Sequence, residues 1–301
     1  MHRRVLNFYI WLAVVIFCAT ASQNTWPQAK LSAAEIVDRN VAARGGQQAW
    51  QSVGSLTMSG KMEAGGNKRA SLPVPNLHDP HAVVPTRPIE QVQLPFVMEL
   101  KRPRKMRVEL QYRGQTAIQV FDGTNGWKLR PFLNRMDVEP YTAEELRTAL
   151  LQSELDGPLV DYAGKGTKVE LAGMEKIDGN DTYKLQVTTK EGHAFHVWID
   201  AKTFLEAKIE GAPRRLDGRY HPVEIYYREY RTVGSLKVSY LLETKVLNTP
   251  GVNDARRTDV AVEKITVEKV EINPKLNDSL FARPQLDIAA GARPPKTVAA
   301  K

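Results

Sequence analysis

Residues 106–112 read Met-Arg-Val-Glu-Leu-Gln-Tyr, and this stretch decides the fold class. Its apolar side chains alternate with polar ones, so a β-strand places Met106, Val108, Leu110 and Tyr112 on one face. The same alternation recurs along most of the chain after residue 55, interrupted by turns rich in Gly and Asp. Strand starts about ten to twelve residues apart predict a mainly β protein of about eleven strands, arranged as an up-and-down antiparallel sheet or a partly closed barrel.

Two segments carry helix signals. Ser32-Ala33-Ala34-Glu35 and Thr142-Ala143-Glu144-Glu145 are capping boxes, in which the first and last residues satisfy each other's backbone N–H groups. An apolar stripe at helical spacing follows each box. We therefore expect two short helices that cover one face of the predicted sheet. The stripe residues that we expect to face the sheet and a ligand are Ile36, Val37, Leu146, Leu150 and Leu151.

The N-terminus has the pattern of an export signal. Arg3 and Arg4 precede an apolar run, residues 5–17, that is interrupted only by Asn7, and Ala19-Thr20-Ala21 forms a small-x-small cleavage site. The run is shorter than the roughly 20 residues that span a bilayer. We expect residues 1–21 to be a cleaved signal peptide and the mature protein to be periplasmic.

The single cysteine, Cys18, lies inside this segment. A lipoprotein signal places small residues just before the modified cysteine, whereas bulky Phe17 precedes Cys18 here. We therefore expect cleavage after Ala21 and no lipid anchor at Cys18. The mature chain then has no thiol, which excludes disulfides and thiol chemistry.

The rest of the chain reads as one domain, residues 22–284, followed by a disordered tail over residues 285–301. Residues 71–95 are rich in proline, which central strands do not tolerate, so we interpret them as a long insertion loop.

Composition and motifs argue against catalysis and nucleic-acid binding. The net charge of +8 is scattered, and the chain has neither zinc-ligand spacing nor a recognition-helix signal. It has no Gly-x-Ser-x-Gly elbow, and no spacing of His, Cys, Asp or Glu points to a metal site. We expect no enzymatic activity, no metal, no cofactor and no nucleic-acid partner.

The predicted sheet has more apolar side chains on one face than two short helices can hide. An uncovered apolar patch of more than a few hundred Å² usually marks a binding site. We therefore predict that hydrocarbon completes the core on the concave face. The residues expected on the sheet side of this site are Met58, Met98, Met106, Val108, Leu110, Ile118 and Val120.

Four short motifs occur in a characteristic order along the chain. They are Ala43-Arg44-Gly45-Gly46, Lys101-Arg102-Pro103-x-x-Met106-Arg107, Phe121-Asp122-Gly123-x-x-Gly126-Trp127 and Phe281-x-x-Pro284. With an export signal before them, they resemble the LolA/LolB-like fold, and in particular the outer-membrane lipoprotein-sorting protein group.

This resemblance implies an open half-barrel with a helical lid whose concave face takes acyl chains of lipids or lipoproteins. The family's carriers keep an arginine that ties the lid shut through backbone hydrogen bonds. By strand position Arg102 or Arg107 corresponds to it, and the basic residues around Pro103 and in the 214–219 loop are candidates for contact with lipid headgroups at the membrane surface. Two alternatives remain open: an envelope sensor or scaffold that binds a protein partner, and an envelope hydrolase.

Overall fold

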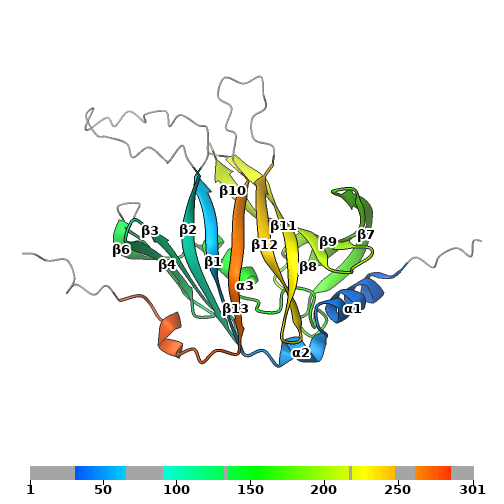
Figure 1. Ribbon diagram of the computed structural model, residues 1–301, viewed down its shortest axis with the longest axis horizontal. Helices are drawn as coiled ribbons and strands as arrows, with labels where there is room; N and C mark the ends of the chain where they lie inside the picture. Colours follow the sequence, from blue (N-terminus) through cyan, green and yellow to red (C-terminus); the bar gives the residue numbers. More distant parts are fainter. Residues whose placement is uncertain (1–30, 66–90, 132–134, 217–218, 248–261, 286–301) are drawn as a thin grey trace, which may run out of the picture. The chain divides into compact units, whose positions relative to one another are not determined.

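The computed structural model describes residues 31–65, 91–131, 135–216, 219–247 and 262–285 (Figure 1). The chain divides into two units, residues 1–31 and 32–301, and the fold described below belongs to the second. The predicted signal peptide with Cys18, most of the proline-rich insertion and residues 286–301 lie outside the described residues.

The described chain is mainly β, as predicted. Thirteen antiparallel strands form one open sheet in the order β6-β5-β4-β3-β2-β1-β13-β12-β11-β10-β9-β8-β7 (Figure 1). The strands are β1 (Ser55–Gly65), β2 (Gln91–Lys101), β3 (Lys105–Tyr112), β4 (Gln115–Phe121), β5 (Gly126–Arg130), β6 (Arg135–Pro140), β7 (Lys168–Ile177), β8 (Asn180–Thr188), β9 (Ala194–Asp200), β10 (Glu206–Leu216), β11 (Arg219–Val233), β12 (Leu236–Val246) and β13 (Glu263–Ile272). Since β6 and β7 are the two edges and do not pair with each other, the sheet is a half-barrel rather than a closed barrel.

Three short α-helices accompany the sheet in the described residues: α1 (Ala33–Ala43), α2 (Gln47–Gln51) and α3 (Ala143–Gln152). Both predicted capping boxes are present, at the start of α1 and of α3. After α1 the chain turns at Gly45, whose φ is +119°. A Cβ at Gly45 would lie 2.3 Å from the backbone oxygen of Ser235, so this turn needs glycine for conformation and for space.

The proline-rich insertion ends earlier than predicted, because residues 91–95 belong to β2. Pro95 pairs with Lys61 of β1, but β2 pairs with β3 only from Phe96 onward. Pro95 therefore lies where one side of the strand has no partner strand, which is where a strand tolerates proline. The alternation of apolar and polar residues also did not predict β6, which forms one edge of the sheet.

The register defines two faces of the sheet. Leu100, Met98 and Phe96 of β2 pair directly with Met106, Val108 and Leu110 of β3, so all six side chains share one face, which we call the inner face. The opposite, outer face carries Arg107 of β3. It is covered near β3 by a 3-10 helix, η2 (Asp278–Phe281), whose Phe281 is buried.

The connection between β6 and β7 must cross the sheet, because these consecutive strands are its two opposite edges. It consists of α3 and the turns that follow, residues 143–167, which we call the strap (Figure 1). α3 and Met106 of the inner face border one cavity, which places the strap over that face. The chain's topology therefore supplies a cover for the inner face.

Candidate functional site

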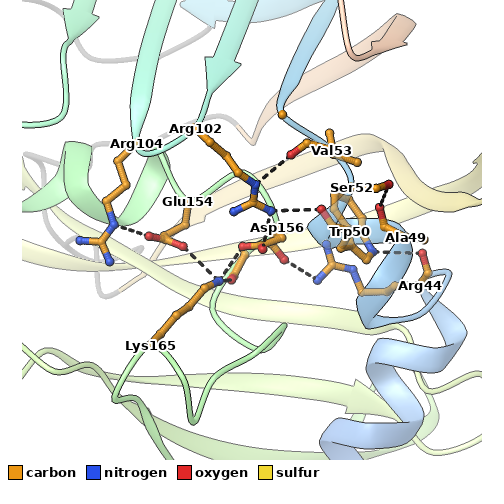
Figure 2. Close-up of polar contacts among 12 residues, drawn as sticks. Arg44, Ala49, Trp50, Ser52, Val53, Arg102, Arg104, Glu154, Asp156 and Lys165 are labelled. Atoms are coloured by element: carbon orange, nitrogen blue, oxygen red, sulfur yellow. Dashed lines mark hydrogen bonds and ion pairs between the residues drawn. The ribbon is translucent and has the colours of Figure 1, made fainter.

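Asp156 anchors the strap to the rest of the domain (Figure 2). It is 2% exposed, and its carboxylate accepts hydrogen bonds from Arg102 Nη2 at 2.8 Å and from Lys165 Nζ at 2.5 Å. Its backbone oxygen accepts a third from Arg44 Nη1 at 3.1 Å. A buried carboxylate is costly unless it is paired and hydrogen-bonded. Because Arg44 follows α1 and Arg102 follows β2, these bonds tie the strap to two other parts of the domain.

Glu154 makes a second anchor two residues earlier in the strap. Its carboxylate accepts a hydrogen bond from Arg104 Nε and lies 3.0 Å from Lys165 Nζ (Figure 2). Charge-assisted hydrogen bonds of this kind are about twice as strong as neutral ones. We call Arg102, Arg104, Glu154, Asp156 and Lys165 the latch.

The structure separates the two arginines that the resemblance left open. Arg102 contacts the strap, and it also donates from Nε to the backbone oxygen of Val53 at 2.8 Å and from Nη2 to that of Trp50 at 3.1 Å. Arg107 lies on the outer face, where it donates to the backbone oxygen of Leu280 at 3.0 Å. Arg102 therefore links the strap to the segment between α2 and β1, whereas Arg107 contacts η2 on the opposite face.

The N-terminal half of α3 is held by two further contacts. Lys128 of β5 donates to both carboxylate oxygens of Glu145 at 2.5 and 2.6 Å, and Tyr220 of β11 donates to Glu144 at 3.0 Å. Burial opposes ionisation of Glu145, but the hydrogen bonds from Lys128 and the Thr142 backbone outweigh it and lower the pKa of the carboxyl below its ordinary value. Glu145 therefore stays charged and paired.

An apolar cavity of ≈ 280 Å³ lies between the strap and strands β9–β11. Leu150, Leu151 and Pro158 border it from the strap, and the sheet contributes Phe195, Ile209, Ile225 and Tyr227. Burial, and to a smaller degree Glu206, raises the pKa of Tyr227 to about 12, so its phenol stays neutral. Pockets for small ligands begin at about 300 Å³, so the cavity has room for a small group and not for a long chain.

The inner face continues beyond this cavity as an apolar surface. Tyr227 pairs with Leu242 of β12, and Leu242 pairs with Ile265 of β13, so the cavity floor and this surface are continuous. The surface surrounds a buried cluster of Phe96, Tyr240 and Val267. The half-buried residues packed against that cluster, which we call the apolar wall, are Met58, Met62, Met98, Leu110, Val233, Val238, Leu242, Ile265 and Val270.

The structure brings together part of the predicted site. Met58, Met98, Val108 and Leu110 are half-buried on the inner face, and Met106 is buried at its strap end. Leu150 and Leu151 border the apolar cavity, and Leu146 is half-buried on α3. Ile36 and Val37 are buried on α1, and Val37 lies beside Leu159 and Tyr162 of the strap, away from the apolar wall.

The placement of Ile118 and Val120 on the concave face is wrong. Val120 pairs with Arg107 and Ile118 pairs with Glu109, so both lie on the outer face. In residues 115–121 apolar side chains occupy both phases of the alternation, so the sequence alone does not fix which phase points inward. The register shows that the other phase, which includes Ala117 and Phe121, faces inward.

Sequence reasoning named Arg102 but missed the rest of the latch and the cavity floor. It gave Asp156 no role, although the apolar residues Leu155, Leu159 and Val160 around it signalled a buried segment. Ile209 and Ile225 were predicted strand residues, but only the strand order shows that the strap lies over them.

Among the described residues, no group of three or more His, Cys, Asp or Glu side chains is arranged to hold a metal ion. In the same part of the chain, none of the helices has the length and apolar character needed to span a membrane.

Comparisons with known proteins find similarity in structure only. No protein-family model and no curated protein sequence matches the chain. A DUF1329 family protein from Desulfovibrio piger has a similar fold, with 12% identity and a TM-score of 0.50 over 83% of this chain and 97% of that chain.

Two further solved structures bear names from the group that the sequence motifs resemble. A LolA superfamily protein from Nitrosomonas europaea is 13% identical over 84% of this chain and 98% of its own, with a TM-score of 0.49. A putative outer membrane lipoprotein-sorting protein domain from Vibrio parahaemolyticus is 12% identical over 83% and 95%, with a TM-score of 0.48. At these identities the similarity concerns the fold alone.

Proposed function

We propose that this protein is a non-enzymatic, periplasmic lipid-binding protein that holds acyl chains of lipids or lipoproteins against its inner face. In this proposal it acts in the sorting or transport of lipoproteins to the outer membrane. The observation that carries the proposal is the half-buried apolar wall, continuous with the cavity beneath the strap. The fold that the chain shares with proteins named for lipoprotein sorting is consistent with it.

The energetics favour a hydrocarbon ligand. Each buried methylene contributes about 0.8 kcal/mol, so one acyl chain binds usefully without specific polar contacts. Met58, Met62 and Met98 lie in the wall, and methionine adapts its shape to varied apolar ligands.

The strap acts as a lid in this proposal. The cavity is too small for a full acyl chain, so entry requires the strap to move away from β9–β11. Arg102 and Arg104 of the latch have side chains that are 36% exposed, whereas Asp156 is buried, so water would solvate its carboxylate when the strap opens.

We propose that the end of the sheet formed by β10 and β11 contacts the membrane surface. The basic residues around Pro103 are engaged within the protein, since Lys101 and Lys105 pair with Asp278 and the arginines pair with the strap. Arg215 and Arg219 are exposed beside Tyr220, which is 56% exposed. A basic and aromatic tip of this kind suits anionic headgroups.

Native mass spectrometry of gently purified protein tests the proposal. We expect mass additions that correspond to acylated lipid, and uptake of lipid when stripped protein meets vesicles. Leu110→Asp, which places a charge in the apolar wall, should reduce uptake at least about tenfold. Gln111→Asp is the matched control, because the neighbouring side chain is exposed.

Stripped wild-type protein that takes up no lipid would overturn the proposal, as would a folded Leu110→Asp variant with unchanged uptake. A partner-binding scaffold that uses the same wall would purify without lipid, so the measurement also separates that alternative from the proposed one.

A further inference from the structure

A second cavity adjoins the apolar one beneath α3. Its volume is ≈ 190 Å³, and Thr148, Gln152 and Ala212 border both cavities. The two cavities are therefore direct neighbours under the strap, with these three residues between them.

The second cavity is bordered by polar and apolar residues in similar measure, and its charged side chains all have partners. Lys128 pairs with Glu145 at 2.5 Å, Arg130 pairs with Glu139 at 2.6 Å, and Glu144 accepts a hydrogen bond from Tyr220. Gln119 is a neutral polar residue of the same lining. The lining thus offers hydrogen bonds without an excess of positive charge.

Two hydrogen-bonding groups in this lining have no partner among the described residues. Arg130 Nε and Tyr141 Oη are buried, and neither makes a hydrogen bond there. Leaving a buried donor unsatisfied is costly, so such groups in residues that border a cavity point to a missing acceptor.

Contacts with Gly126 leave the Tyr141 ring little freedom to move. Its ring lies so close to Gly126 that a Cβ there would be 1.9 Å from a ring carbon, and its backbone N–H donates to the Gly126 oxygen at 2.8 Å. Burial, and then the charge of Glu145, raises the pKa of the phenol. Tyr141 Oη therefore keeps its proton and remains available as a donor.

We propose that this second cavity receives the uncharged ester or amide group of an acylated ligand, while the first part of the hydrocarbon chain occupies the adjoining apolar cavity. The inference rests on the proposed lipid-binding function and deepens it. The two unpaired donors suit a carbonyl oxygen, and the balanced charges disfavour an anion, which would bring an uncompensated charge into a buried site. The small volume suits a linking group rather than a large sugar.

A matched pair of probes tests this assignment. 1-Monopalmitoylglycerol and 1-O-hexadecylglycerol have the same chain length and head, but only the first has a carbonyl. Competition against a fluorescent fatty-acid probe should show that the wild-type protein binds the ester about 5–10-fold more tightly than the ether. Tyr141→Phe should reduce that preference to about twofold or less and leave the affinity for the ether unchanged.

Two more variants test the same assignment. Arg130→Lys keeps the charge but removes the Nε donor, so it should weaken binding of the ester alone. Tyr183→Phe, on β8 with its ring stacked on Phe204, is the matched control and should keep the full preference.

The experiment distinguishes failure of this assignment from failure of the proposed lipid-binding function. Equal affinity of the wild-type protein for ester and ether would overturn the assignment and leave lipid binding intact. If the protein bound palmitate more tightly than the ester, the inference that this cavity receives an uncharged group would be wrong. Absence of binding by both glycerol lipids and palmitate would overturn the assignment together with the proposed function.

Discussion

The inner face of this sheet has two halves that differ in what covers them. In the half formed by β7–β9, Leu185, Val187, Val197 and Ile199 are at most 1% exposed. In the half formed by β1–β3, β12 and β13, residues of the same kind such as Met98 and Leu242 are only half-buried. The alternating pattern that builds both halves is the same, so strand sequence does not explain the difference.

The difference follows from the path of the chain. α1 lies beside β7, and the strap brings Leu155, Leu159 and Val160 into the core, which gives the β7–β9 half a cover made of protein. Among the described residues no helix or turn supplies the same number of fully buried side chains over the β1–β3 half. One half is therefore closed by the protein's own side chains, and the other keeps half-buried apolar side chains.

The largest expected difference between the halves is in stability. Leu185→Ala in the covered half should lower the free energy of unfolding by about 2–5 kcal/mol, because it leaves a cavity in a closed core. Leu242→Ala in the apolar wall should cost only about 1 kcal/mol, because its side chain is already partly solvated. Urea unfolding of lipid-free protein measures both, and equal losses would show that the wall is ordinary core.

The next effect concerns the latch that separates cavity from solvent. A double-mutant cycle with Arg102→Met and Asp156→Asn should give a coupling energy of about 1–3 kcal/mol, since the pair is a charge-assisted hydrogen bond to a buried carboxylate. Arg102→Met should also speed both uptake and release of lipid. Arg107→Met, on the outer face, is the control and should change neither rate. Unchanged rates in Arg102→Met would remove the strap from the entry path.

The smallest effect is the pH dependence of the contact between α3 and β5. The folded-state pKa of Glu145 lies below its ordinary value of 4.5, so its stabilisation is present above that value and is lost as the pH falls through the lowered pKa. We expect less than about 1 kcal/mol, because the Glu145 side chain is 37% exposed and solvent screens the pair. Unfolding measured below pH 5 should show a shallower loss in Glu145→Gln and in Lys128→Met. An unchanged slope in both would contradict this origin.

The sequence predicted the elements well and their spatial relations less well. Alternation and capping boxes are local signals, which is why most strands and the starts of α1 and α3 were found. The strand order is a property of the whole chain, and only that order shows that the β6–β7 connection crosses the sheet.

Individual site residues show the same limit. Val108 and Leu110 were placed correctly because their strand is apolar in one phase only, whereas β4 is apolar in both phases and Val120 was placed on the wrong face. Asp156 could not be recognised as an anchor, because its partners Arg102 and Arg44 are far away in sequence.

Photolabelling with a palmitate that carries a diazirine on its chain tests the central claim most directly. The account predicts labelled peptides from the apolar wall and the cavity beneath the strap, with Met58, Met98, Leu110 or Leu242 among the modified residues, and loss of labelling when unlabelled palmitate competes. Labelling confined to the outer face around Val120, or labelling that competitor does not reduce, would contradict it.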